Sequence, residues 1–166
     1  MTTDLIPTCD LCDRFKGDTS GDFRVLPPVF REFGGRAAFS GTAVTVKCFE
    51  DNTSVKALLE GPGEGRVLVV DGAGSLRRAL VGGNIGAAAA RNGWAGVIVD
   101  GCVRDVAELA VCDVGIRALA PMPLPPERRQ PGLLDQPVQI QGVTVRPGDW
   151  ICADVDGIVV MGARPA

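Results

Sequence analysis

Two short runs of consecutive apolar residues constrain the fold of this chain more than any other feature. Residues 66–71 read Arg-Val-Leu-Val-Val-Asp, and residues 96–100 read Gly-Val-Ile-Val-Asp. Apolar runs without alternation are typical of strands that are buried on both faces of a sheet. An Ala-rich segment at 83–92 lies between them and predicts a helix. The order of strand, helix and strand therefore predicts an α/β fold.

The flanking segments predict further elements. Residues 42–48 alternate like a strand, Asn52 is expected to cap a helix, and another helix is expected to start near Arg104 or Asp105. The last thirty residues contain short apolar runs separated by Gly and Pro turns, a pattern typical of antiparallel hairpins. We therefore expect mixed sheet layers with flanking helices. The remaining predicted elements are a helix at 8–15 and strands at 79–81, 138–140, 143–145, 150–153 and 158–161.

Length and composition are those of a single globular domain spanning residues 1–166. Within it, the Pro-rich and charged residues 121–137 are expected to form a surface loop. The net charge of -3 offers no basic excess, so we expect no direct contact with nucleic acid. No apolar run approaches the roughly 20 residues needed to span a bilayer. Because residues 1–4 also lack the pattern of a signal peptide, we expect a cytoplasmic protein without membrane contact.

The residues that are missing narrow the chemistry. The chain contains no histidine and no tyrosine, which excludes Ser-His-Asp and Cys-His nucleophile systems and His-based zinc sites. Among six cysteines only Cys9 and Cys12 form a Cys-x-x-Cys pair. A structural zinc would need a second pair or histidines, so we interpret the cysteines as packing thiols. Any acid or base must be a carboxylate, a lysine, a thiol or water on a metal.

Two glycine-rich segments could approach a ligand. The segment 71–75 (Asp-Gly-Ala-Gly-Ser) resembles a nucleotide loop, but its third glycine is replaced by Arg77, so we interpret it as a plain turn. Residues 82–86 precede the Ala-rich helix, whose free N–H groups could hold a carboxylate. Close packing explains these glycines equally well. Arg104 favours a ligand site, because it follows the next buried strand, where open α/β sheets place ligands.

Asp105 and Glu108 allow two interpretations. Their spacing fits a capping box with Asp105 at the N-cap and Glu108 at N3. The same turn directs both carboxylates outward beside Arg104, and such hard oxygen ligands suit Mg or Mn. The two roles do not exclude each other for Glu108.

Other ionisable residues have weaker claims to a function. Lys47 or Lys56 could form a Schiff base with a keto acid, but nothing in their surroundings favours it, and solvated side chains are the simpler interpretation. Asp154 and Asp156 are most simply turn residues. A carboxylate contributed by one of them to a neighbouring subunit is the alternative.

The spacing of Gly83, then twenty residues, then Arg104-Asp105 and Glu108 resembles the motif of a known family. This family comprises the 4-hydroxy-4-methyl-2-oxoglutarate aldolases together with the RraA proteins. The resemblance covers nearly the whole chain. It implies a compact swivelling β/β/α domain that assembles as a homotrimer or hexamer, with active sites at subunit interfaces.

The aldolase branch implies a divalent-metal-dependent carbon-carbon lyase acting on a small 2-keto acid. Such an enzyme cleaves 4-hydroxy-4-methyl-2-oxoglutarate to pyruvate and also acts as an oxaloacetate decarboxylase through the same pyruvate enolate. The resemblance implies Asp105 as a ligand of Mg or Mn, with Glu108 beside it, and Arg104 facing the keto oxygen. The backbone of Gly83, Asn84 and Ile85 would bind the carboxylate.

The RraA branch implies a different function. Residues 46–52 and 66–81 look closer to RraA proteins, which inhibit ribonuclease E by protein contact and without catalysis. RraA proteins that serve only as regulators can lack the acidic residue after the arginine, whereas Asp105 is present here. Because function depends on sites rather than folds, the sequence favours the enzyme.

Overall fold

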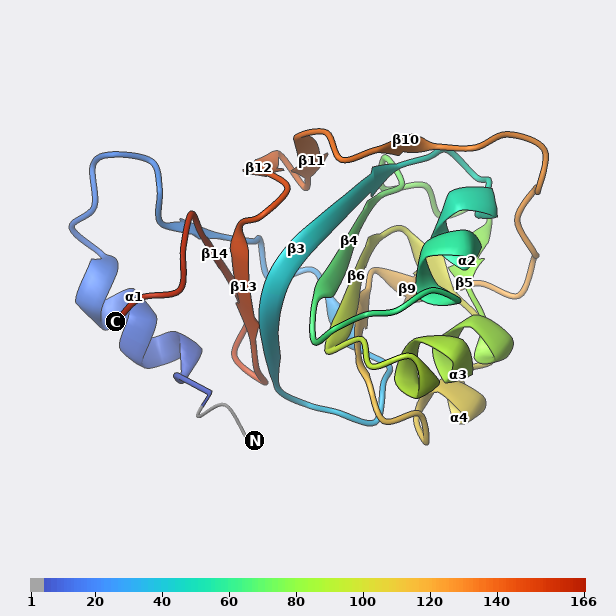
Figure 1. Cartoon of the computed structure of the whole chain (residues 1–166), viewed down its shortest axis with the longest axis horizontal. Coiled ribbons are helices and arrows are strands. Elements are labelled where there is room, and N and C mark those ends of the chain that lie inside the picture. The colour runs from blue at the N-terminus through green and yellow to red at the C-terminus, as the bar shows by residue number, and fades with distance from the viewer. Residues whose placement is uncertain (1–4) are drawn as a thin grey trace.

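The computed structural model describes residues 5–166 (Figure 1), so the expectation for residues 1–4 lies outside the described residues. Its largest sheet has nine strands. Four central strands are parallel, and the strands on both sides of them are antiparallel. Their order is β1 (Arg24–Val25), β14 (Ile158–Met161), β13 (Trp150–Ala153), β3 (Phe39–Lys47), β4 (Val67–Asp71), β6 (Gly96–Asp100), β8 (Gly115–Ala118) and β2 (Arg31–Glu32), with β10 (Leu133–Leu134) paired to β3.

The two apolar runs form β4 and β6 at the centre of this sheet. Every residue of both strands is buried, as the absence of alternation predicts. They pair in parallel, with Val67 opposite Gly96 and Asp71 opposite Asp100. The α/β prediction is therefore confirmed.

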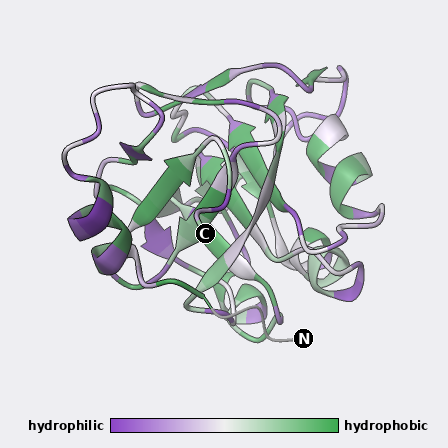
Figure 2. Ribbon diagram, turned by 60° about the vertical axis from the view of Figure 1, so that its left-hand side comes forward, coloured by the Kyte–Doolittle hydropathy of each residue, from purple (hydrophilic) through white to green (hydrophobic). Residues whose placement is uncertain are grey.

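The helices cover the sheet unequally. In Figure 1, α2 (Thr53–Leu59), α3 (Gly83–Arg91) and α4 (Val106–Leu109) lie together on one side of the parallel strands. On the opposite side, α1 (Thr8–Phe15) packs its buried Leu11 against β13 and β14. Figure 2 shows the strands between them as the apolar interior. The result is a curled mixed sheet with flanking helices, as expected.

A second, smaller sheet positions the candidate site. It contains β5 (Ala79–Val81), β7 (Cys102–Val103) and β9 (Ala120–Pro121), all parallel. Each of these strands follows a central strand of the large sheet along the chain. The sequence predicts only β5, because two-residue strands such as β7 and β9 leave no periodic pattern. The segments that follow the three strands therefore meet at one edge.

The C-terminal strands form two antiparallel hairpins, as expected, and the two hairpins belong to different sheets. All four predicted runs form strands, but β11 (Val138–Ile140) and β12 (Val143–Val145) pair only with each other, whereas β13 and β14 extend the large sheet. The hairpin of β11 and β12 is held by the buried carboxylates at the ends of β4 and β6. Asp71 accepts a hydrogen bond from the N–H of Gln139 (3.2 Å), and Asp100 accepts one from Nε2 of Gln141 (2.7 Å).

Two local predictions are corrected. The Pro-rich segment 121–137 is largely irregular, but Leu133 and Leu134 form β10, because they pair with Lys47 and Val46 of β3. The cysteines at 48, 102, 112 and 152 are buried as expected, whereas Cys9 is exposed on α1. Within residues 5–166, no helix has the length and hydropathy to cross a membrane.

Candidate active site

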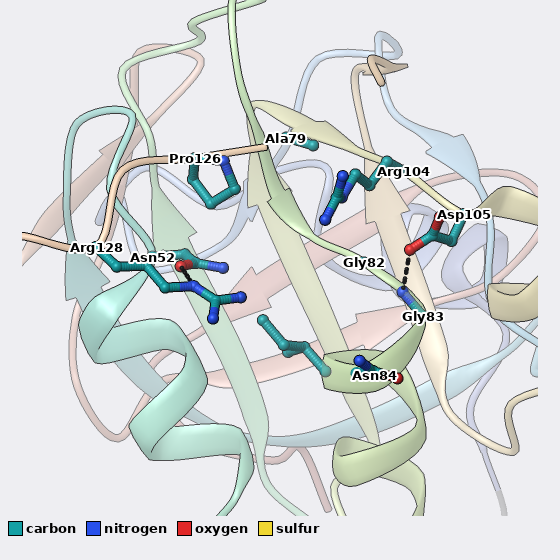
Figure 3. Close-up of a pocket in the computed structure, with 10 residues that line it drawn as sticks. Asn52, Ala79, Gly82, Gly83, Asn84, Arg104, Asp105, Pro126 and Arg128 are labelled. Carbon is teal, nitrogen blue, oxygen red and sulfur yellow. Dashed lines mark hydrogen bonds between the residues drawn. The ribbon is translucent and has the colours of Figure 1, made fainter. Parts of the chain in front are cut away.

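A polar pocket lies at the edge where the segments following β5, β7 and β9 meet (Figure 3). The start of α3 forms one wall, the residues after β7 form another, and the Pro-rich loop closes the third side. This pocket brings together five of the six residues selected from the sequence. Its lining residues are Asn52, Ala79, Gly82, Gly83, Asn84, Ile85, Arg104, Asp105, Pro126 and Arg128.

A hydrogen bond holds the backbone of Arg104 in place, whereas its guanidinium makes few contacts with the rest of the protein. Its N–H donates to the carbonyl of Val81 (2.9 Å), which ties the end of β7 to the end of β5. Its Nη1 makes one long hydrogen bond of 3.4 Å to the carbonyl of Pro123. Within residues 5–166, no carboxylate lies at ion-pair distance from it. Its donors are therefore available for a ligand oxygen.

Asp105 has a different role from the predicted capping box. It occupies the N-cap position of α4 in a left-handed conformation (φ 57°), which Asp tolerates better than most residues, but its side chain does not cap α4. Its Oδ2 instead accepts a hydrogen bond from the N–H of Gly83 (2.9 Å), the first residue of α3. The capping-box interpretation is wrong. The carboxylate bridges two helix starts, and Asp105 is one of the residues that line the pocket.

Glu108 lies on the other side of Gly83 and outside the pocket. Its exposed side chain lines an adjacent groove, which shares Gly83 and Asn84 with the pocket. The two carboxylates approach the same glycine, because Asp105 binds its N–H while a Cβ on Gly83 would overlap the carboxylate of Glu108. A side chain at position 83 would therefore displace Glu108.

The donor set fits a hydrated hard cation better than a fully caged one. Within residues 5–166, no group of three or more His, Cys, Asp or Glu side chains is placed to hold a metal. Magnesium is commonly bound through one or two carboxylates and keeps several waters. Asp105 and Glu108, on either side of Gly83, suit that mode of binding.

The start of α3 provides donors for an anion. Asn84 is exposed and Ile85 is buried, and both belong to the first turn of the helix. The N–H groups of a first turn have no acceptor within their own helix, and the helix dipole favours negative charge there. The free N–H groups of this wall suit an anion, and binding of a carboxylate here stays a prediction.

Two polar lining residues were missed at the sequence level. Asn52 is buried and its Nδ2 donates to the carbonyl of Leu80 (3.0 Å), while its Oδ1 accepts from Nε of Arg128 (3.3 Å). Asn52 does occupy the N-cap of α2, but its side chain does not cap the helix. That role falls to Asp51, which accepts from the N–H of Thr53 (2.9 Å).

The Pro-rich loop is anchored against this wall. The buried Asp51 accepts hydrogen bonds from the N–H groups of Arg129 (2.6 Å) and Gln130 (3.0 Å). Burial acts to raise the pKa of Asp51, but hydrogen bonds from Thr53, Arg129 and Gln130 outweigh it and lower the pKa to about 2. An ionised Asp51 therefore fixes the loop that carries Arg128.

The remaining candidates lie elsewhere. Lys47 is exposed, and Nζ of Lys56 pairs with Glu60 (3.5 Å), so neither lysine lines the pocket. The segment after β4 is a turn, as expected. Asp154 accepts hydrogen bonds from the N–H (2.8 Å) and Oγ1 (2.6 Å) of Thr8, and it lines a different hollow together with Asp156.

Fold and pocket together define an α/β protein with a curled mixed sheet and a polar pocket that is lined by Arg104, Arg128 and Asp105. A family model described as RraA-like, Aldolase/RraA, matches residues 8–160. The chain therefore belongs to the RraA-like family. It is 65% identical to a protein of Albidiferax ferrireducens that carries the provisional name 4-hydroxy-4-methyl-2-oxoglutarate aldolase, with 98% of each chain covered.

Solved structures agree on the fold but differ in their described functions. The RNA-processing inhibitor RraA from Thermus thermophilis is 43% identical, with a TM-score of 0.91 over 97% of this chain and 95% of that one. A structure described as an S-adenosylmethionine:2-dimethylmenaquinone methyltransferase from Geobacillus kaustophilus is 39% identical. Its TM-score is 0.88, and the match covers 96% of each chain.

Proposed function

We propose that the chain is a divalent-metal-dependent class II aldolase that cleaves 4-hydroxy-4-methyl-2-oxoglutarate to pyruvate and also decarboxylates oxaloacetate. The observation that carries this proposal is that one pocket contains both the guanidinium of Arg104, which makes a single long hydrogen bond, and the carboxylate of Asp105, which is held by the N–H of Gly83. The provisional names of two relatives, at 65% and 57% identity, support the aldolase part of this proposal.

Each residue has a defined part in this proposal. Asp105, with Glu108 nearby, would hold Mg or Mn. A bound divalent cation supplies Lewis acidity where negative charge develops. The N–H groups of Asn84 and Ile85 bind the carboxylate of the pyruvyl end, and Arg104 donates hydrogen bonds to its keto oxygen.

Both reactions form the same pyruvate enolate, with negative charge on the C2 oxygen. In the aldol cleavage the C4 hydroxyl gives its proton to water, the C3–C4 bond breaks to leave C4 as the ketone of one pyruvate, and the electron pair forms an enolate on C3, C2 and the C2 oxygen. This enolate takes a proton from water at C3 to give the second pyruvate. In oxaloacetate the C3–C4 bond breaks to release CO₂ and leaves the same enolate, which takes a proton at C3 to give pyruvate. A fixed donor such as Arg104 stabilises the enolate oxygen more than the ground-state ketone.

Pyruvate formation tests the proposal directly. Pyruvate is measured from 4-hydroxy-4-methyl-2-oxoglutarate and from oxaloacetate, with Mg, after chelation, and after Mg is restored. We expect Arg104→Ala to lose about 100-fold or more in kcat, since removal of a preorganised donor typically has that effect. Arg91→Ala removes an exposed arginine of the same charge outside the pocket and is the matched control. Metal-independent turnover, or equal rates in Arg104→Ala and wild type, would reject the proposal.

The proposal includes an assembly. We expect a homotrimer or a hexamer, in which a neighbouring subunit completes the site at the open side of the pocket. Sedimentation at several protein concentrations tests this expectation, and a monomer that is fully active would contradict it.

A second candidate function is inhibition of ribonuclease E through protein contact. The likeness to the Thermus inhibitor at 43% identity supports it. Such an activity would depend on exposed surface and not on the pocket. Substitution of Asp105 should leave inhibition of ribonuclease E intact while it removes pyruvate formation.

A further inference from the structure

The pocket contains a second guanidinium, which comes from a different part of the chain. Arg104 follows β7, whereas Arg128 belongs to the Pro-rich loop on the facing wall (Figure 3). Asp105 is the only carboxylate among the lining residues. The lining therefore carries an excess of positive charge even before a cation binds, which favours a ligand with more than one negative group.

The guanidinium of Arg128 is oriented but not neutralised. Its Nε donates to Oδ1 of the buried Asn52 (3.3 Å), and this bond leaves both terminal amino groups for another acceptor. Within residues 5–166, no carboxylate lies at ion-pair distance from Arg128, whereas its neighbours Arg78 and Arg129 both pair with Glu127 (3.4 and 3.2 Å). Such a free fork is suited to bidentate binding of a carboxylate.

The backbone around Arg128 is held in place. The N–H groups of the two residues that follow it both donate to Asp51, and the N–H of Asn52 donates to the carbonyl of Glu127 just before it (3.2 Å). Buried partners thus hold the backbone on both sides of Arg128, while the hydrogen bond to Asn52 orients its exposed side chain. A side chain that is partly oriented in advance loses less entropy when it binds a ligand.

We propose that Arg128 is the specificity-determining residue that binds the distal carboxylate of a dicarboxylic 2-keto acid. The inference rests on the proposed function, in which Arg104 and the start of α3 hold the pyruvyl end. In 4-hydroxy-4-methyl-2-oxoglutarate the distal C5 carboxylate keeps its charge throughout C3–C4 cleavage. Arg128 therefore binds ground state and transition state equally, and its loss raises KM while kcat is retained.

Oxaloacetate should respond differently to the same change. Its distal C4 carboxylate is the group that leaves as CO₂ and loses its charge. A guanidinium bound to that carboxylate stabilises the ground state more than the transition state. Loss of Arg128 should therefore raise the KM for oxaloacetate but leave its kcat unchanged or higher.

The test compares Arg128→Gln with wild type and with Arg129→Gln, whose arginine is 82% exposed and lies outside the pocket. Three reactions are measured with Mg present: cleavage of 4-hydroxy-4-methyl-2-oxoglutarate, decarboxylation of oxaloacetate, and deuterium exchange into the methyl group of pyruvate. Pyruvate has no distal carboxylate. Its exchange reports on the enolate-forming residues alone.

We expect Arg128→Gln to raise the KM for both dicarboxylates about 10- to 100-fold, the usual size of a charged hydrogen-bond pair. Pyruvate exchange should stay within twofold of wild type, Arg128→Lys should recover part of the binding, and Arg129→Gln should resemble wild type. An unchanged KM in Arg128→Gln, or a parallel loss of pyruvate exchange, would overturn the assignment of Arg128 alone. Absence of all three reactions from the wild-type enzyme would overturn the proposed function and the assignment with it.

Discussion

Two hollows of this molecule are lined by arginine, but the two side chains differ in how many contacts they make with the rest of the protein. In the candidate active site, Arg104 makes one long hydrogen bond through its side chain. In the other hollow, Arg117 is 2% exposed and its Nη2 donates to the carbonyls of Ala37 and Asp154. Its guanidinium also lies over the ring of Phe39, 5.3 Å from the centroid. Its buried Nη1 has no hydrogen-bond acceptor within residues 5–166.

The charge around the two hollows differs as well. Arg117 lies 3.6 Å from Glu32, and the lining also includes Asp154 and Asp156. Burial lowers the pKa of the Arg117 guanidinium, while Glu32 and Asp154 partly offset the effect. An anion would be repelled by this acidic rim. An arginine that the fold already uses is structural, and one that the fold leaves free is available for a ligand.

The largest expected effect is the loss of pyruvate formation in the variant Asp105→Asn. This substitution keeps an oxygen for the N–H of Gly83 and removes only the charge, so the pocket should retain its shape. We expect at least about a 100-fold loss of pyruvate formation, with the midpoint of thermal unfolding unchanged. Asp113→Asn, an exposed carboxylate that pairs with Arg36, is the control. Equal losses in the two variants would show that the charge of Asp105 has no special role.

Substitution of Arg117 should lower the stability of the fold and leave the activity unchanged. Arg117→Met removes the donor to two backbone carbonyls and the partner of Glu32, so we expect the free energy of unfolding to fall by about 3 kcal/mol. Activity per folded molecule should be unchanged. Arg104→Met should change the free energy of unfolding by less than about 0.5 kcal/mol. Urea unfolding measures the free energy of unfolding of both variants. Similar values for the two would contradict the structural role given to Arg117.

Asp51 links stability to the loop of the active pocket through pH. Its folded pKa of about 2 lies below that of an unfolded Asp, so its contribution is present above pH 4 and is lost as the pH falls towards 2. We expect the free energy of unfolding of wild type to exceed that of Asp51→Asn by about 2 kcal/mol at neutral pH. This difference should shrink between pH 4 and pH 2. Urea unfolding of both proteins across that range is the measurement. A difference that does not vary with pH would contradict the role of the ionised carboxylate.

The smallest effect concerns the position of Glu108. Gly83→Ala should displace the carboxylate of Glu108 at little cost in stability, because alanine favours helices and the displaced side chain is exposed. We expect about a 10-fold higher Mg concentration for half-maximal activity, comparable to the loss of an outer metal contact. Glu108→Ala should cause the same change, and the double variant should add little. Additive effects in the double variant would show that Gly83→Ala does not act through Glu108.

The sequence predicted the frame of the molecule better than its site. The runs that form β4 and β6 are apolar throughout, so burial on both faces was readable. The role of Asp105 was not, since the same spacing fits a cap on its own helix and the actual partner, Gly83, is twenty-two residues away.

Arg128 shows a second reason for the difference. It lies in a Pro-rich segment without periodicity, and its place in the pocket depends on the hydrogen bonds of Asp51 to the loop backbone. Such contacts are long-range and leave no local pattern. β7 and β9, which bring the walls together, are likewise too short to be predicted.

Deuterium exchange into the methyl group of pyruvate tests the central claim most directly, because it requires enolate formation and nothing else. It is followed by NMR with Mg and after chelation, in wild type, Asp105→Asn and Arg117→Met. We expect exchange in wild type and Arg117→Met with Mg, and at least about a 100-fold slower exchange after chelation or in Asp105→Asn. Exchange that persists in Asp105→Asn, or that does not need the metal, would contradict an enolate site built on Arg104 and Asp105.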